Sequence, residues 1–333
     1  MFPLLHNTCS KEDLVADIRR ECAKANRNNV TRTQAYLRYY LEHPEIQWAL
    51  LAHLVSRNGG WNMTDLHGEW LPRILDEQQR TAFFHFLERC NWLIFHDAYA
   101  QLLLYAEMKR YDHDLTDVLP RLGVSCFMEP IWRNFLVDHD MVRLTHSLII
   151  NEQHYIEQRV VQKPFYQQEV LDTLPFHLQS LLSLNHVLFP YRDQSAESRT
   201  RLIGITVHRF SSLEQRIAMG KTLYQLLRTD KQRLAQIVEW AKRTPHTGSR
   251  SDYWPHLFRP VRAKADDQLY SPWLVTTWPD VTHAPADGVD WYRDDAWLTR
   301  LGTEKLLPTI DENDYTRSLA VLKAGLALTH PFS

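Results

Sequence analysis

Apolar residues recur at helical spacing through the first half of the chain, which predicts a series of helices over residues 11–160. The segment 45–57 is apolar on nearly every face, and this pattern indicates a helix that is buried all round. The triplet 58–60, Asn-Gly-Gly, follows directly. Because these residues tolerate positive φ, we expect the helix to end there.

Further helices are predicted from spacing and from capping residues. Asp76 can cap a long helix over 77–110, and Asp230 can cap a later one. Prolines and a glycine break 115–140 into shorter helices. The one strand-like piece, 202–207, is too short and isolated to form a sheet. The other predicted helices are 33–42, 141–160, 172–188, 212–227, 231–242 and 312–328.

The chain changes character after Arg243. Prolines alternate with tryptophans from residue 244 to about 303, and disordered segments are poor in aromatic residues. The whole pattern predicts an all-α fold in one structural domain. An irregular multi-helix bundle occupies 1–243, and an ordered Pro/Trp-rich wrap with a terminal helix packs on it over 244–333. The tryptophans of the wrap are Trp254, Trp273, Trp278, Trp291 and Trp297.

Composition and charge narrow the class of protein. The chain has 333 residues and is 44% apolar, so it can bury a large core. Its 38 Lys and Arg nearly balance 40 Asp and Glu, which argues against binding to nucleic acid or to an anionic membrane. The four cysteines lie far apart, as expected for reduced thiols. Without a signal peptide or an apolar run of about 20 residues, we expect a cytoplasmic protein.

Several catalytic motifs are absent from the sequence. It contains no G-x-S-x-G, no Walker phosphate loop, no dinucleotide glycine fingerprint and no H-E-x-x-H. No Glu precedes a His by three positions, so the ligands of ferritin-like di-iron bundles are missing too. These absences argue against the ordinary enzymes of those classes, and they leave the cofactor unknown.

Residues 56–65, Ser-Arg-Asn-Gly-Gly-Trp-Asn-Met-Thr-Asp, hold more hydrogen-bonding groups than the end of a helix requires. We interpret this first polar string as a candidate site. Its candidate ligand-binding residues are Arg57, Asn58, Trp61 and Asn62, and Asp65 is a candidate catalytic carboxylate.

Three polar residues lie on apolar helix faces. His53, Asn91 and Glu152 each have apolar neighbours three or four positions away, and a buried polar group without a partner costs about 1–3 kcal/mol. One interpretation is a polar pocket in which Asn91 binds ligand, Glu152 has a raised pKa and His53 is its proton partner. The other is a structural network that fixes helix register. Glu88 and Asp97 are expected on a half-exposed helix shoulder.

A second polar string follows a predicted helix at 245–254. Backbone N–H groups near 247–249, together with Arg250, can bind a phosphate or carboxylate. The alternative is a loop tied to the helices by an Arg250–carboxylate pair and a docked tryptophan. The candidate ligand-binding residues here are His246, Ser249, Arg250 and Asp252.

Two Asp-His-Asp triplets, 112–114 and 138–140, contain ligand types that a divalent metal accepts. Both occur at predicted helix ends, where Asp caps are routine. We therefore predict caps and no metal site.

Four segments resemble the YppC-like proteins of Bacillus and relatives: residues 36–66, Asn151-Glu152-Gln153, 188–191 and 246–254. The resemblance extends over nearly the whole chain and implies a bacterial cytosolic protein. That family is a domain of unknown function, so the resemblance assigns no catalytic residue.

Two hypotheses for function follow. In the first, a buried polar pocket binds a small ligand, for which an anionic group is one option, and the loop 246–254 closes it; no enzyme activity is assignable. In the second, the protein is a non-enzymatic helical scaffold that binds a partner through the Trp-rich region. The first hypothesis requires the two polar strings to lie side by side.

Overall fold

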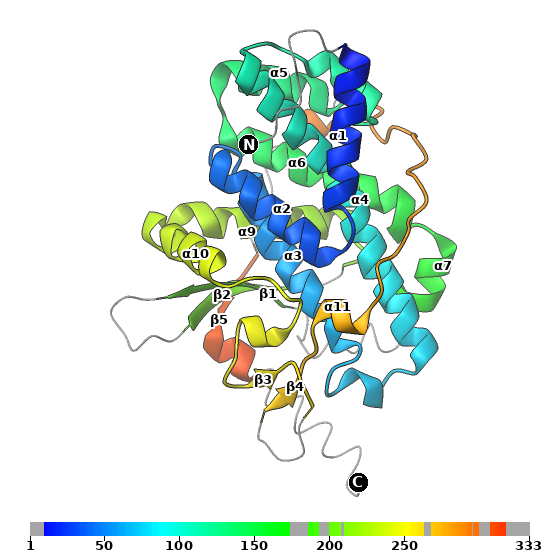
Figure 1. The fold of residues 1–333 in the computed structure, drawn as a ribbon, viewed down its shortest axis with the longest axis vertical. Helices are drawn as coiled ribbons and strands as arrows, with labels where there is room; N and C mark the ends of the chain where they lie inside the picture. The colour runs from blue at the N-terminus through cyan, green and yellow to red at the C-terminus, as the bar shows by residue number, and fades with distance from the viewer. Residues whose placement is uncertain are drawn as a thin grey trace, which may run out of the picture.

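The computed structural model describes residues 10–173, 186–192, 200–207, 210–262, 268–294, 296–299 and 307–317. Over these residues the molecule is mostly helical, with a small three-stranded sheet at one side (Figure 1). The predicted helical class is therefore confirmed in its coarse form. The prediction of a purely all-α fold is wrong because of the sheet.

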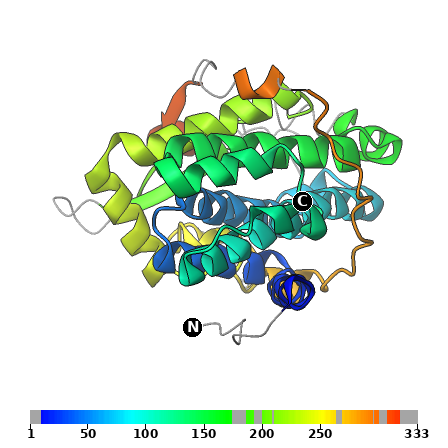
Figure 2. The same ribbon diagram turned by 90° about the horizontal axis from the view of Figure 1, so that it is seen from above.

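The helices of the main body follow one another in chain order. The longer ones are α1 (Lys11–Ala25), α2 (Asn29–Glu42), α3 (Gln47–Asp65), α4 (Glu77–Tyr111), α5 (Met128–Asp138), α6 (Met141–Ile156), α9 (Leu213–Thr229) and α10 (Lys231–Arg243). Short helical turns between them are η1 (Leu71–Arg73), η2 (Thr116–Leu122), η3 (Glu157–Val161), α7 (Pro164–Tyr166) and η4 (Gln167–Leu171). Helix α6 packs against α4, α5 and α9 (Figure 2).

Side-chain caps set where these helices begin. Asp76 accepts a hydrogen bond from the backbone of Gln79 at the start of α4, and Asp230 does the same for Arg233 in α10. Both caps confirm predictions. In the first Asp-His-Asp triplet, Asp112 ends α4 in the left-handed conformation. In the second, His139 ends α5 and Asp140 caps α6, so the triplets lie at helix ends as predicted.

Helix α3 does not end at the glycine pair. It continues to Asp65, so the predicted end at residues 58–60 is wrong. A Cβ on Gly60 would lie 2.5 Å from His246 Nε2 and 2.6 Å from Asn29 Oδ1. This glycine is therefore required for close packing and not for positive φ.

The sheet lies where the sequence predicted a helix and an isolated strand. Strands β1 (His186–Arg192), β2 (Thr200–Thr206) and β5 (Thr309–Asp311) pair antiparallel in the order β1-β2-β5. The helix predicted over 172–188 is thus wrong at its C-terminal end, and its residues 174–185 lie outside the described chain. Strand β1 buries residues of both faces, and such an apolar run lacks the period of two that marks a strand.

The Pro/Trp-rich wrap has little regular structure. It contains η5 (Arg250–Asp252), β3 (Phe258–Arg259), β4 (Leu269–Tyr270), α11 (Leu274–Thr277) and α12 (Ala296–Thr299). Beyond α11 it runs in extended form along α4 toward α5 (Figure 1). Of the predicted terminal helix, residues 312–317 are helical and 318–328 lie outside the described residues.

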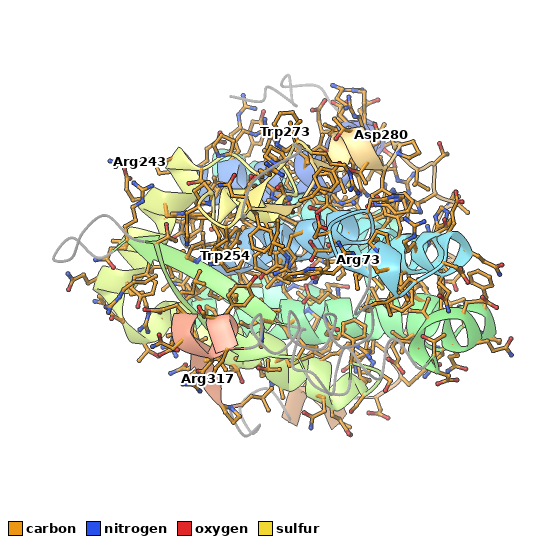
Figure 3. The ribbon with its side chains drawn as sticks, turned by 90° about the horizontal axis from the view of Figure 1, so that it is seen from below. Arg73, Arg243, Trp254, Trp273, Asp280 and Arg317 are labelled. Carbon is orange, nitrogen blue, oxygen red and sulfur yellow. The ribbon has the colours of Figure 1, made fainter. Side chains whose placement is uncertain are left out.

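Most of the described tryptophans of the wrap dock on the body. Trp254 and Trp291 are buried, and Trp278 stacks on Phe84 with ring centres 4.1 Å apart. Trp273 is 40% exposed on the face seen in Figure 3. The side chain of Trp297 lies outside the described residues. None of the described helices is long and apolar enough to cross a membrane.

Candidate functional site

The two polar strings lie side by side and pair with each other. Arg250 donates from Nε and Nη2 to Asp65 Oδ2, at 2.7 and 2.6 Å, and from Nη1 to the Tyr315 hydroxyl at 2.6 Å. Its guanidinium also lies 4.9 Å from the ring centre of Trp61. Burial alone would lower the pKa of Arg250, but Asp65 and Tyr315 raise it above its usual range. Its charge is thus matched within the protein.

Arg57 holds the end of α10. It donates to the carbonyls of Thr244 at 2.7 Å and Pro245 at 3.3 Å, and it lies 4.4 Å from the ring centre of Trp240. A guanidinium at a helix C-terminus is favoured by the helix dipole. Asp252 Oδ2 lies 3.7 Å from its Nη2. Burial lowers the pKa of Arg57.

Most backbone N–H groups of the second string already have acceptors, including those of Thr247, Ser249 and Arg250. Thr247 donates to Asp252 from its backbone at 2.8 Å and from its hydroxyl at 2.6 Å. The backbone of Ser249 donates to Thr247 Oγ1, and that of Arg250 donates to Ser271 Oγ. Burial would raise the pKa of Asp252, but contacts from His246, Arg57 and Thr247 lower it overall. A protein carboxylate therefore occupies the position expected for an external anion.

The histidines and Asn58 complete the same network. Asn29 donates its amide to Ser56, so its oxygen accepts from His246 Nε2 at 2.7 Å. His53 Nδ1 lies 2.8 Å from the Thr33 carbonyl, and burial holds its pKa well below the usual range. Asn58 accepts from the Leu188 backbone at 2.9 Å and donates back to it at 3.0 Å, which fixes β1 on α3.

We call this network the α3 lock. Ser249 belongs to it through a 2.5 Å bond to the Ser271 carbonyl, and Asn62 lies half-buried on the same helix. The other members are His53, Arg57, Asn58, Trp61, Asp65, His246, Arg250 and Asp252. Most of the candidate residues of both strings therefore hold the C-terminal segment and β1 on α3.

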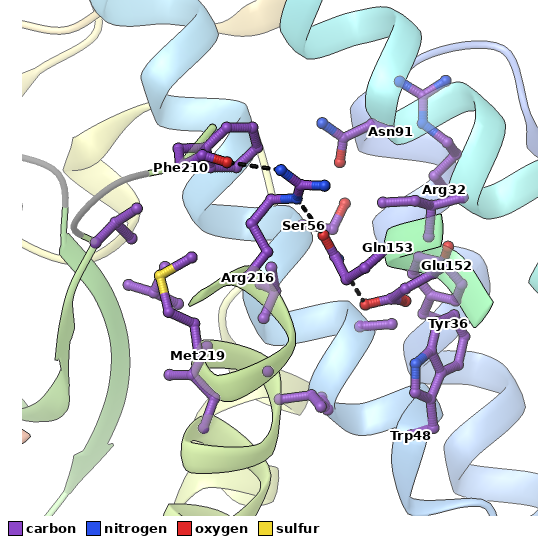
Figure 4. Close-up of a pocket in the computed structure, with 18 residues that line it drawn as sticks. Arg32, Tyr36, Trp48, Ser56, Asn91, Glu152, Gln153, Phe210, Arg216 and Met219 are labelled. Carbon is purple, nitrogen blue, oxygen red and sulfur yellow. Dashed lines mark hydrogen bonds between the residues drawn. The ribbon is translucent and has the colours of Figure 1, made fainter. Parts of the chain in front are cut away.

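A pocket of about 150 Å³ meets the lock at Ser56 and lies between α2, α3, α4, α6, α9 and β1 (Figure 4). Two of the predicted site residues, Asn91 and Glu152, line it. Its apolar lining includes Leu51, Val55, Val187, Val207, Met219 and Leu223. Its polar lining comprises Arg32, Tyr36, Trp48, Ser56, Asn91, Glu152, Gln153 and Arg216.

Glu152 is the unusual group of this pocket. Its carboxyl accepts from Gln153 Nε2 at 3.2 Å, and no described cation forms an ion pair with it. Burial raises the pKa of Glu152 to about 8. This value already includes the opposing hydrogen bonds from Gln153 and Trp48 and a smaller rise from the nearby Asp97. At neutral pH the carboxyl is therefore mostly protonated.

Both arginines of the pocket have acidic partners. Arg32 donates to Glu88 at 2.5 Å, and Glu88 is buried. Arg216 donates to Glu157, to Gln153 Oε1 at 2.9 Å and to the Phe210 carbonyl at 2.7 Å. Glu152 is thus the pocket carboxyl without a positive partner among the described residues.

The predicted acid–base pair is not formed. The groups that shift the pKa of His53 are Arg57, Thr33 and His246, and those that shift the pKa of Glu152 do not include His53. His53 belongs to the lock, whereas Glu152 faces the pocket (Figure 4).

Sequence reasoning missed several pocket residues. Arg216 shares a helix face with Gly220, Leu223 and Leu227, by the same spacing that singled out Glu152. The others missed are Arg32, Tyr36, Trp48 and Gln153, whereas Ser56 belongs to the first polar string. The prediction that Glu88 and Asp97 lie on a half-exposed face of the long helix is wrong, because both side chains are buried.

Comparison with known proteins agrees with the resemblance seen in the sequence. The chain matches the model of the family described as "Protein of unknown function (DUF2515)" over residues 24–304, and it belongs to that family. It is 40% identical over 304 residues to the uncharacterized protein YppC of Bacillus subtilis (strain 168), covering 91% of this chain and 90% of that one. No solved structure matches it.

Proposed function

We propose that this protein binds a small, mostly apolar organic molecule in the pocket beside Glu152. The observation that carries the proposal is a carboxyl that lines open volume and has no cation paired to it among the described residues. Gln153 and Trp48 hydrogen-bond to this carboxyl, but its ionised form has no counter-charge among the described residues, and a ligand in the pocket could supply one. Ionisable groups with strongly shifted pKa values also cluster at functional sites.

The dimensions of the pocket limit the ligand. About 150 Å³ accommodates a molecule of roughly the size of benzene, with few non-hydrogen atoms beyond that. The mainly aliphatic lining suits an apolar body, and the polar groups suit a single polar head. The anionic ligand expected from the sequence depended on Arg57 and Arg250, whose charges have Asp252 and Asp65 beside them.

The Trp-rich region gives less support to a partner-binding scaffold. Trp254, Trp278 and Trp291 all contact the body, and Trp273 is the described tryptophan of the wrap with substantial exposure. We further propose a bacterial cytoplasmic location, in keeping with the Bacillus relative and with the buried free thiols of Cys22 and Cys90.

A thermal-shift screen tests binding in the pocket. The compounds would be amines, alcohols, acids and aromatics of up to about ten non-hydrogen atoms. A ligand at 100 times its Kd stabilises the protein by about 2.7 kcal/mol, so hits raise the Tm of the wild type. We expect Ala52→Leu, which fills the pocket, to abolish those shifts.

Val137→Leu on α5 is the matched control, because Val137 is 82% exposed. Its melting curve and its ligand shifts should equal those of the wild type. Hits that survive Ala52→Leu unchanged, or a screen without hits, would contradict the proposal.

A further inference from the structure

The charges around the pocket are balanced except at one position. The guanidinium of Arg32 faces Glu88, and that of Arg216 faces Glu157. Within the described part of the chain Glu152 has no such partner, so ionising it leaves one negative charge there without a counter-charge. An anionic ligand would add a second unbalanced charge, whereas a cationic ligand would balance Glu152.

Aromatic rings stand beside the same carboxyl. Tyr36 and Trp48 both line the pocket and form an edge-to-face pair with centres 5.5 Å apart. Glu152 influences the pKa of Tyr36, and Trp48 hydrogen-bonds to Glu152, so both rings are its neighbours. Trp48 meets the carboxyl through its indole N–H, at the edge of the ring, so the two rings border the part of the pocket where the head group of a ligand would lie.

Asn91 supplies an acceptor on another wall. Its amide nitrogen donates to the Leu87 carbonyl at 2.8 Å, so its oxygen is the part of the amide that can accept from a ligand. An ammonium group carries three donors and needs such acceptors. The aliphatic lining, formed partly by Leu51, Val187 and Leu223, receives the rest of the molecule.

We infer that the ligand class of this pocket is a small apolar primary amine, bound as its ammonium ion against Glu152. This inference rests on the proposed function, since it specifies the ligand of the same pocket. It departs from the anionic ligand that the sequence suggested.

The inference gives a definite pH dependence. The pKa of Glu152 is raised to about 8 by burial and by Asp97, so the carboxyl must release a proton when an amine binds at neutral pH. The other charged or titratable groups lining the pocket around it are Tyr36, Arg32 and Arg216. Amine affinity should therefore rise about tenfold per pH unit below pH 8 and level off above it.

Three compounds that share one alkyl group and differ only in their polar head group distinguish a cationic, a neutral and an anionic ligand. Isopentylamine, isopentanol and isocaproate are titrated calorimetrically into the wild type and into Glu152→Gln. We expect the amine to bind the wild type most tightly and to release about one proton at pH 7, seen in buffers of different ionisation enthalpy. Glu152→Gln should weaken the amine at least tenfold and change the alcohol less than about twofold.

These titrations distinguish a failure of the amine inference from a failure of the proposed binding function. If the alcohol or the carboxylate binds as tightly as the amine, the amine inference is wrong while binding in the pocket stands. If none of the three binds, the inference is also wrong, and the wider screen decides whether the pocket binds anything. The thermal melt of Glu152→Gln shows that the variant is folded, and the pH profile of the wild type tests the inference without any variant.

Discussion

At the scale of single residues, the buried charges divide into those with protein partners and those without. Arg250 has Asp65 and Tyr315, whereas Glu152 has hydrogen bonds but no cationic partner in the part of the chain that the structure describes. The sequence could predict that Glu152 points inward, because helical spacing puts it among apolar residues. It could not predict which charges pair, because Asp65 and Arg250 are 185 positions apart.

The Arg250–Asp65 pair should contribute strongly to stability. Asp65→Asn leaves the Arg250 charge buried without its counter-ion, so we expect a loss of about 3 kcal/mol in the free energy of unfolding by urea. Glu129→Gln is the matched control, because its pair with Arg133 is exposed and should contribute less than about 1 kcal/mol. Equal losses in the two variants would contradict the lock as described.

Asp97 should make stability depend on pH. Burial raises the pKa of Asp97 to about 7, against hydrogen bonds from Asn151 at 2.6 Å and Gln101 at 2.8 Å. The folded state then binds a proton that the unfolded state has lost, so this contribution to stability falls as pH rises from about 4 to 7.

The free energies of unfolding of the wild type and of Asp97→Asn are compared by urea denaturation at several pH values. Relative to that variant, the wild type should lose up to about 1.4 kcal/mol per pH unit between about pH 5 and 7. Above pH 8 the difference should be constant. Parallel curves for the two proteins would show that Asp97 titrates normally.

At the scale of elements, α3 shows where local signals mislead. The Asn-Gly-Gly triplet is a common helix end, yet α3 continues through it to Asp65 because the glycines let His246 and Asn29 approach. Strand β1 shows the same limit. Its pairing with β2 is a tertiary contact that apolar spacing along the chain does not reveal.

The adjacent glycines of α3 offer a matched test. Gly60→Ala places a Cβ 2.5 Å from His246 Nε2, so we expect a loss of about 1–3 kcal/mol. Gly59→Ala meets nothing closer than 3.4 Å, and Ala favours a helix over Gly by about 1 kcal/mol, so this variant should be neutral or stabilising. Denaturation of both by urea measures the difference, and a reversed order would rule out the close contact at Gly60.

At the scale of the whole molecule, the wrap joins distant elements. Trp291 donates to Asn151 in α6 at 2.9 Å, and Arg159 donates to the Val289 carbonyl at 2.7 Å. The aromatic content predicted that this segment is ordered. Its path could not be predicted, because it depends on single hydrogen bonds to α4, to the segment just before α5 and to α6, and not on a repeating pattern.

The whole fold also shows that the candidate residues divide between the α3 lock and the pocket. The sequence placed Arg57, Asp65, Asn91 and Glu152 in one site, since each is a polar residue that needs a partner. In the folded chain Arg57 and Asp65 belong to the α3 lock. Asn91 and Glu152 line the pocket. The pocket itself is formed by helices and a strand from across the chain, so spacing within one helix cannot predict it.

The most direct test of this account is the Kd of one small ligand from the thermal-shift screen, measured by calorimetry on two variants below their melting temperatures. Ala52→Leu alters the pocket, and Asp65→Asn alters the lock. We predict that Ala52→Leu weakens binding at least about tenfold, or 1.4 kcal/mol, while Asp65→Asn changes Kd less than about twofold. Loss of binding in Asp65→Asn with unchanged binding in Ala52→Leu would contradict the account and place the site at the first polar string.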